Sequence, residues 1–182
     1  AGRGPLAGPV VAAAVILPTH VSLQGLTDSK KLSPSAREKF FPMIQAVALG
    51  YGIAVVSEDV IDEINILQAS LLAMKLAVEK LPEPPDYLLI DGTHPVKLPM
   101  HQKAIVEGDS LSLSIAAASV LAKVTRDRLM ADYHGAFPQY GFDRHKGYGT
   151  QLHRDRIKEF GPCPIHRKTF KGVREFLNKI DF

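Results

Sequence analysis

The stretch Ala1-Gly2-Arg3-Gly4-Pro5-Leu6-Ala7-Gly8-Pro9, followed at once by the apolar run of residues 10–17, decides how this part of the chain folds. Gly2 and Gly4 flank an arginine, and a loop so poor in side chains lets its backbone N–H groups approach a phosphate or a sugar closely. Arg3 adds a fork of donors suited to an oxyanion. Residues 10–17 have the length and composition of a buried strand. The stretch therefore predicts a binding loop beside a core strand.

A loop of this kind normally hangs from the end of a strand. We therefore expect the natural chain to be longer than this sequence, with a strand upstream of Ala1. Without that strand, we expect a slot in the sheet that leaves the backbone groups of its neighbours exposed. Taken alone, the loop has an alternative interpretation as an ordinary glycine turn with a solvated arginine.

Strands and helices alternate along the rest of the chain. Apolar spacing predicts strands at residues 10–17, 51–57, 87–90 and 103–106. It predicts helices at 34–47, 59–80, 115–129, 151–159 and 171–180, the first capped by Ser33. Residues 135–150, rich in glycine and aromatic side chains, are expected to be irregular. The pattern predicts one α/β domain with a mixed sheet, in which residues 1–130 form the core and residues 131–182 form a basic loop and a helical extension.

Composition narrows the class of protein. The 182 residues carry a net charge of +3, but residues 123–182 hold 13 Lys and Arg against 7 Asp and Glu, whereas residues 1–122 are slightly acidic. A basic third beside an acidic body suggests a polyanionic partner, although many solvated helices are equally basic. No apolar run approaches the length of a membrane span, so we expect no membrane partner. The lone Cys163 cannot form an internal disulfide, which fits the cytoplasm, and it shows no zinc spacing.

Two aspartates are candidate metal ligands. Asp91 and Asp109 each follow a predicted strand and lie beside a glycine, at the rim where α/β sheets bind ligands. Two carboxylates that converge there repel each other unless a cation lies between them. Hard oxygen ligands suit Mg²⁺ or Mn²⁺. Taken singly, an Asp-Gly turn and a Gly-Asp-Ser helix cap explain the same residues.

A second cluster has the composition of a nucleic-acid contact. Asp143-Arg144-His145-Lys146-Gly147-Tyr148-Gly149-Thr150 combines cations for phosphates, glycines for close approach and a ring that can stack on a sugar or a base. A basic loop with a packed tyrosine is the competing interpretation.

Together the motifs resemble the type 2 ribonucleases H, and most closely their bacterial ribonuclease HII branch. The resemblance covers nearly the whole chain and rests on the opening loop together with Asp28-Ser29-Lys30-Lys31-Leu32, Asn65-Ile66-Leu67-Gln68-Ala69, Ile90-Asp91-Gly92, Gly108-Asp109-Ser110, Ala122-Lys123-Val124-Thr125-Arg126-Asp127, Lys146-Gly147-Tyr148-Gly149-Thr150 and Gly161-Pro162-Cys163-Pro164-Ile165-His166-Arg167. Arg3 between two glycines favours this branch over ribonuclease HIII, which has lysine there and an extra N-terminal domain.

The resemblance implies a fold and an activity. It implies a ribonuclease H-like fold with a helical C-terminal extension, hydrolysis of RNA in RNA–DNA hybrids, and incision 5′ of a single ribonucleotide in duplex DNA. Such an enzyme serves DNA replication and repair in the cytoplasm, and we expect a monomer. Two divalent ions, Mg²⁺ or Mn²⁺, are expected on four carboxylates: Asp91, Asp109 and an Asp-Glu pair immediately upstream of Ala1. The alternative is a catalytically inactive domain that only binds nucleic acid.

The resemblance also implies roles for substrate-binding residues. Gly2, Arg3 and Gly4 are expected to contact the 2′-OH of the ribonucleotide and the following DNA junction. Tyr148 is expected to stack on the deoxyribose after it. Phosphate contacts are expected from three lysines: Lys30, Lys31 and Lys146.

Overall fold

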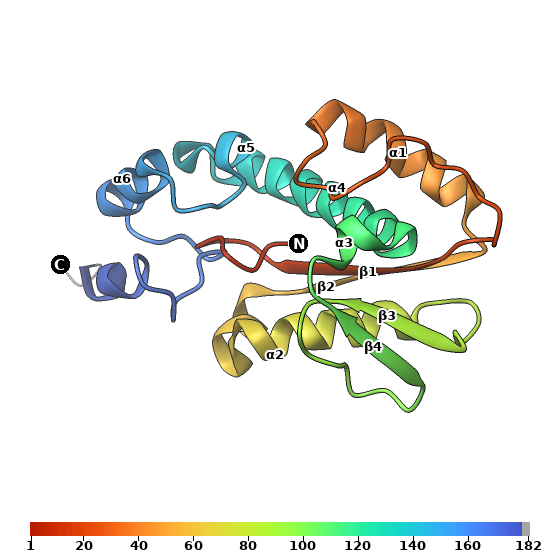
Figure 1. The fold of residues 1–182 in the computed structure, drawn as a ribbon. Coiled ribbons are helices and arrows are strands. Elements are labelled where there is room, and N and C mark those ends of the chain that lie inside the picture. The colour runs from red at the N-terminus through yellow and green to blue at the C-terminus, as the bar shows by residue number, and fades with distance from the viewer. Residues whose placement is uncertain (180–182) are drawn as a thin grey trace.

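The computed structural model describes residues 1–179 (Figure 1). Its elements, in chain order, are β1 (Val10–Ile16), α1 (Pro34–Val47), β2 (Gly50–Val56), α2 (Glu58–Glu79), β3 (Tyr87–Asp91), β4 (His101–Ile105), α3 (Gly108–Leu111), α4 (Leu113–Ala136), the 3₁₀ turn η1 (Pro138–Tyr140), α5 (Phe142–His145), α6 (Gln151–Phe160) and the 3₁₀ segment η2 (Arg174–Lys179). The predicted mixed α/β class is confirmed.

The described strands form two pairs. β1 and β2 are antiparallel, with Val10 opposite Val56 and Ile16 opposite Gly50. β3 and β4 run parallel. The strands are thus of mixed direction, as expected, but they are not one continuous ladder, because β1 and β3 share no hydrogen bonds among the described residues.

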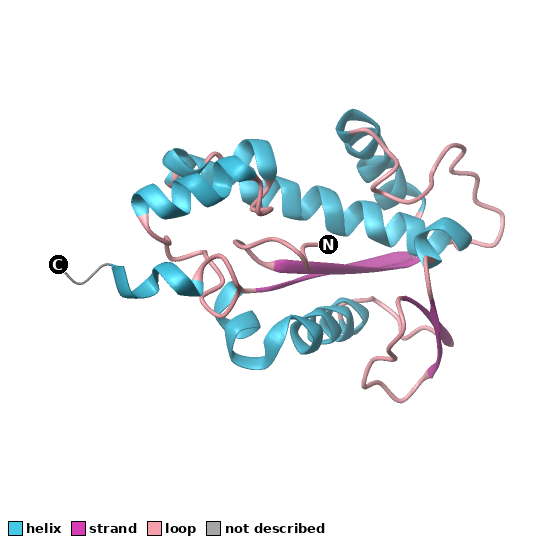
Figure 2. Cartoon of the chain, turned by 60° about the vertical axis from the view of Figure 1, so that its left-hand side comes forward, coloured by secondary structure: helices cyan, strands magenta, loops and turns pink. Residues whose placement is uncertain are grey.

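Helices cover both faces of the β1–β2 pair, with α1 and α4 on one side and α2 on the other (Figures 1 and 2). The period-two alternation of a strand explains this layering. Val10 and Ala12 pack in a core with α2, whereas Ala13 and Val15 pack against the core that α1 and α4 share. β1 is therefore buried on both faces, which accounts for its unbroken apolar sequence.

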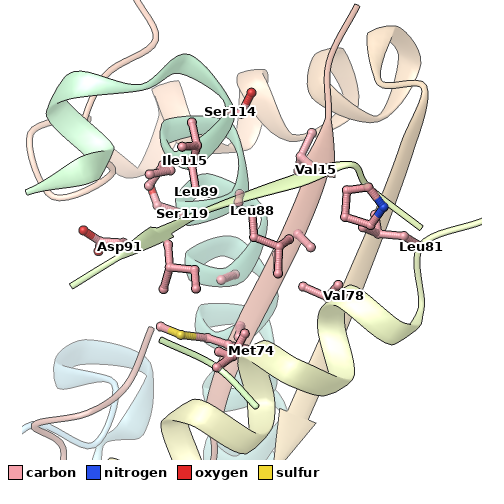
Figure 3. A pocket seen from close by; sticks show the side chains of 18 of the residues that line it. Val15, Met74, Val78, Leu81, Leu88, Leu89, Asp91, Ser114, Ile115 and Ser119 are labelled. Carbon is pink, nitrogen blue, oxygen red and sulfur yellow. The ribbon is translucent and has the colours of Figure 1, made fainter. Parts of the chain in front are cut away.

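A groove of about 580 Å³ lies between β1 and β3. Figure 3 shows Val15 of β1, Leu88 of β3, Met74 of α2 and Ile115 of α4 around it. The groove lies beside the unpaired edge of β1, where the sequence analysis expects a slot. The expectation that an upstream strand fills it stays a prediction.

Helix α4 is the central helix. Its small side chains Ala117 and Ala122 are buried, and the helix packs along β1. It extends to Ala136 rather than ending near residue 129, because buried side chains such as Met130 continue its apolar face. The predicted boundary between core and extension, near residue 130, therefore falls inside a helix.

Helix α1 follows its prediction closely, whereas α2 is kinked. Ser33 caps α1 by accepting a hydrogen bond from the N–H of Ala36 (3.1 Å). In α2, Asn65 has a φ of 68°, and its side chain accepts hydrogen bonds from the N–H groups of Leu67 and Gln68. Asn65 thus interrupts the helix and caps its second half, which a purely periodic pattern does not reveal.

The C-terminal third packs against the opening loop. Ala7 forms a bridge with His166, and Leu6 shares a core with Ile157 and Val173. The predicted helix at residues 151–159 is confirmed as α6. The predicted helix at 171–180 is instead the 3₁₀ segment η2, and residue 180 lies outside the described residues. Residues 135–150, expected to be irregular, contain η1 and α5. Within residues 1–179, no helix has the length and apolar character to cross a membrane.

Candidate active site

Asp91 and Asp109 lie close together, and Asp28 joins them. Asp91 ends β3, and its Oδ1 accepts a hydrogen bond from the N–H of Gly108 at 3.0 Å. Asp109 follows in the first turn of α3, and its carboxyl group interacts electrostatically with that of Asp28. Asp28 precedes α1 and also accepts from the N–H of Lys30 at 2.8 Å. Three chain segments therefore bring three carboxyl groups to one place.

The electrostatics of this cluster favour a cation. Burial raises the pKa of Asp109, and the charges of Asp91 and Asp28 raise it further. Burial also opposes ionisation of Asp28, but the hydrogen bond from the Lys30 N–H, the neighbouring Asp109 carboxyl group and the charges of Lys30 and Lys31 lower its pKa overall. Among the described residues, no three acidic, His or Cys side chains form a complete metal cage. Asp91 and Asp109 nonetheless fit as part of an oxygen ligand set for a divalent ion, because mutually repelling carboxylates are held together here.

The Gly2–Gly4 loop lies beside Tyr148. A Cβ atom placed on Gly4 would be 3.7 Å from Cε1 of Tyr148, whose ring is 43% exposed. Lys123 Nζ and Arg126 Cζ lie 5.9 and 6.0 Å from the ring centroid. The structure thus brings together the opening loop and the loop that carries Tyr148, the two segments predicted to bind substrate.

The loop and the carboxylates lie in the same part of the fold, since Arg3 and Asp91 both line the groove between β1 and β3. Arg3 and Gly4 are exposed, whereas Gly2 is buried and has a φ of +91°. A side chain at Gly2 would clash with Arg126, so Gly2 is required for the backbone shape and Gly4 is not.

The three predicted lysines divide into two groups. Lys30 Nζ is 3.9 Å from Asp109 Oδ2, and Lys31 Nζ donates to Ser110 Oγ at 3.4 Å, so both lie beside the carboxylates. Lys146 differs, because its ammonium donates to the carbonyl oxygen of Asp143 at 2.6 Å. Its backbone carbonyl, rather than its ammonium, is linked to the opening loop, because Arg126 donates a hydrogen bond to it (2.9 Å) and also to Pro9.

Two buried histidines, His153 and His166, form a hydrogen-bonded chain that ends at the backbone of Tyr148. His153 Nδ1 lies 3.0 Å from the carbonyl oxygen of Tyr148, so this nitrogen carries the proton. His153 Nε2 then accepts from His166 Nε2 (3.0 Å), and His166 Nδ1 accepts from the N–H of Cys163 (2.9 Å). Each nitrogen has a partner, which fixes both rings as neutral tautomers and holds the Tyr148 backbone.

Three groups near the site were not among the predicted site residues: Asp28, the two buried arginines Arg126 and Arg167, and the histidine chain. One signal was available, because Arg126 lies at four-residue spacing between Ala122 and Met130 on the buried face of α4. A charge in an apolar stripe indicates a specific partner.

Comparisons with known proteins show the family of the chain. The sequence matches the Ribonuclease HII family over residues 1–173. It is 62% identical to the Ribonuclease HII of Syntrophotalea carbinolica over 97% of this chain and 85% of that protein. The structure resembles the ribonuclease H2 of Pyrococcus horikoshii OT3, with a TM-score of 0.80 and 27% identity over 98% of this chain and 94% of that one. It also shares the fold of Bst-RNase HIII in complex with Mn²⁺, with a TM-score of 0.69 and 17% identity over 100% and 68% of the two chains. The chain therefore belongs to the ribonuclease HII family.

Proposed function

We propose that this protein is an endonuclease that hydrolyses the RNA strand of RNA–DNA hybrids. We further propose that it incises duplex DNA on the 5′ side of a single ribonucleotide and leaves 5′-phosphomonoester ends. Membership of the ribonuclease HII family supports the class of ribonuclease H hydrolases. The observation that carries the proposal is that Asp91 and Asp109 converge beside Lys30 and Lys31, while the side-chain-poor Gly2–Gly4 loop faces the exposed Tyr148.

The chain's own residues supply recognition and orientation. The Gly2–Gly4 loop would contact the ribonucleotide, since Arg3 and Gly4 are exposed and Gly4 has no side chain to block the approach to a 2′-OH. The exposed ring of Tyr148 would stack on the next sugar. Lys30 and Lys31 would hold phosphates beside the carboxylates.

Asp91 and Asp109 would hold the divalent ions, Mg²⁺ or Mn²⁺, together with the further carboxylates that the resemblance implies. When bound, such ions supply an activated water and stabilise the leaving 3′ oxygen. Asp28, which lies close to Asp109, would add negative charge to the same site. We propose two ions as the full complement.

We also propose a nucleic-acid partner, a monomer and the cytoplasm as the compartment. Cys163 is buried, and burial raises the pKa of its thiol to about 11, which makes it a poor nucleophile. This environment supports a structural thiol that stays reduced, and it assigns no chemistry to the cysteine.

The test uses the full-length protein and three labelled duplexes: one with a single ribonucleotide, an RNA–DNA hybrid, and an all-DNA control. With Mg²⁺ or Mn²⁺ we expect one nick 5′ of the ribonucleotide, cleavage along the hybrid, no cleavage of DNA, and no activity in EDTA. Equal cleavage of all three duplexes would overturn the proposal. Tight binding without cleavage would instead favour the inactive nucleic-acid-binding alternative.

A further inference from the structure

Arg126 and Arg167 are fully buried, and both donate hydrogen bonds to carbonyl oxygens of the opening loop. Arg167, in the segment after α6, donates its hydrogen bonds within residues 1–179 to backbone carbonyl oxygens. Its Nη2 donates to Gly2 (2.6 Å) and Pro9 (3.3 Å), its Nη1 to Arg3 (3.1 Å) and its Nε to Gly8 (2.9 Å). One side chain thereby holds both ends of the loop.

Arg126 of α4 complements it. Its Nε donates to the carbonyl of Pro9 (2.9 Å), its Nη2 to that of Ala7 (3.1 Å) and its Nη1 to that of Lys146 (2.9 Å). Arg126 therefore connects the opening loop with the loop that carries Tyr148. This link explains how two segments more than a hundred residues apart come to form one surface.

Neither charge is neutralised locally. Within residues 1–179, neither guanidinium has a carboxylate oxygen within 4.0 Å, and Glu58 and Asp62 act on Arg167 only from farther away. Burial lowers the pKa of Arg167 to about 9, and the charge of Arg126 contributes. With a pKa of about 9, Arg167 remains charged at neutral pH, and a guanidinium such as that of Arg126 stays protonated in proteins. Two buried charges without a counter-ion leave the surface above them attractive to an anion.

The peptide geometry says where that anion would bind. In a trans peptide the C=O and the following N–H point in opposite directions. The carbonyls of Gly2 and Arg3 point inward onto Arg167, so the N–H groups of Arg3 and Gly4 point outward. Neither N–H has an acceptor among the described residues, and both residues are exposed. Consecutive outward N–H groups form an anion-binding nest.

We propose that Arg167 and Arg126 are positioning residues that hold the carbonyls of the opening loop inward, so that the N–H groups of Arg3 and Gly4 bind a phosphodiester group of the nucleic acid. The inference rests on the proposed function and extends it to two side chains that do not touch the substrate. It assigns the buried charge to phosphate affinity rather than to fold stability alone.

The first experiment needs no change to either arginine. Uniformly ¹⁵N-labelled full-length protein carrying Asp109→Asn, which prevents cleavage, is titrated with the single-ribonucleotide duplex and with an all-DNA duplex. We expect the amide resonances of Arg3 and Gly4 to move on binding. The N–H groups of Leu6 and Gly8, already bonded to Gly147 and Ile165 at 2.8 Å, serve as internal controls. Binding that leaves Arg3 and Gly4 unmoved would overturn the inference.

The second experiment compares Arg167→Gln and Arg126→Gln with Arg128→Gln in the same Asp109→Asn background. Arg128 is on α4 but exposed and paired with Glu38, so its variant loses the same charge from the surface. We expect each buried variant that folds to bind the duplex roughly tenfold more weakly, with a slope of log affinity against log salt reduced by about 1. Arg167→Lys keeps the charge but loses the planar guanidinium with its several donors. Its affinity for the duplex should lie between that of Arg167→Gln and that of the parent.

The outcomes separate the two proposals. If the buried variants fold and match Arg128→Gln in both affinity and salt slope, the arginines are only structural and the inference fails, while the nuclease proposal is untouched. If the parent protein binds none of the duplexes, the proposed function itself fails. If Arg167→Gln does not fold, Arg167→Lys and the amide titration of the parent decide.

Discussion

Gly4 lies directly against the ring of Tyr148, with 3.7 Å between the position of a Gly4 Cβ and Cε1 of the tyrosine. The two residues lie far apart in the sequence, and Arg126 links their loops by donating hydrogen bonds to the carbonyls of Pro9 and Lys146. A recognition surface for one ribonucleotide would therefore consist of a bare backbone facing an exposed ring. Several measurable consequences depend on that surface.

A side chain at Gly4 should block recognition without harming the fold. Gly4 has no positive φ and its Cβ would make only an ordinary contact, so Gly4→Val should keep the melting temperature of the parent. We expect nicking at a single ribonucleotide to fall about a hundredfold, on the order of 3 kcal/mol, because the branched side chain fills the approach.

The control for this change is Gly135→Ala, at a helical glycine with open space around it, which should leave activity unchanged. Gly2→Ala should instead lower stability, since its φ of +91° and the adjacent Arg126 leave no room. Full activity of Gly4→Val would refute the recognition role of the loop.

Tyr148→Ala should lower activity roughly ten- to a hundredfold, as expected for a lost stacking contact of about 1–3 kcal/mol. Tyr148→Phe should keep most of the activity because it keeps the ring. The ring is 43% exposed, so thermal melting should change little, and Tyr51→Ala on β2 provides a matched exposed control. A drop of several degrees in melting temperature, with unchanged activity per folded molecule, would mark Tyr148 as a core residue instead.

Asp109→Asn in the full-length protein should abolish cleavage that depends on Mg²⁺ or Mn²⁺. The same change should raise the melting temperature measured in EDTA at neutral pH, because it removes a buried charge repelled by Asp91 and Asp28. Asp91→Asn should lose activity in the same way. The exposed Asp132→Asn on α4 should match the parent in both measurements. Turnover at the parental rate by Asp109→Asn would exclude it as a metal ligand.

The buried histidines should make the fold sensitive to acid. Burial lowers the pKa of His153 to about 4 and that of His166 to about 3, and neighbouring histidines contribute to both. The ordinary value is 6.5. Since the folded pKa is depressed, the stabilising contribution is complete above pH 6.5 and is lost as the pH falls toward 4 and 3.

Urea unfolding between pH 7.5 and 5 tests this expectation. The free energy of unfolding should fall with a slope approaching about 1.4 kcal/mol per pH unit for each buried histidine. His101→Gln, at an exposed position, should keep the parental slope. A stability that does not vary between pH 7 and 5 would contradict the neutral histidine chain.

Local patterns were sufficient for much of the fold. The side chains of strand β1 point alternately into two cores, and the unbroken apolar sequence of the strand already predicts burial on both faces. Ser33 and Pro34 predict the start of α1, because capping and the first helical position depend only on neighbouring residues. Where a single side chain redirects the backbone, as Asn65 does in α2, periodicity alone predicts an unbroken helix.

By itself, the sequence determined the order of strands and helices, the family resemblance and the identity of Asp91, Asp109, Gly4 and Tyr148 as candidates. Only the tertiary structure decided which groups support them. Arg126 and Arg167 find their carbonyl partners 117 to 165 residues away within the loop from Gly2 to Pro9, and such distant pairings leave no local periodicity. Likewise, Lys146 has a charge that suits a phosphate contact, yet in the fold its ammonium donates a hydrogen bond to the backbone carbonyl oxygen of Asp143. The backbone at Lys146 is left-handed, with a φ of 51°. Composition specifies which charges a chain carries, whereas folding determines whether each one faces solvent, a carbonyl or another charge.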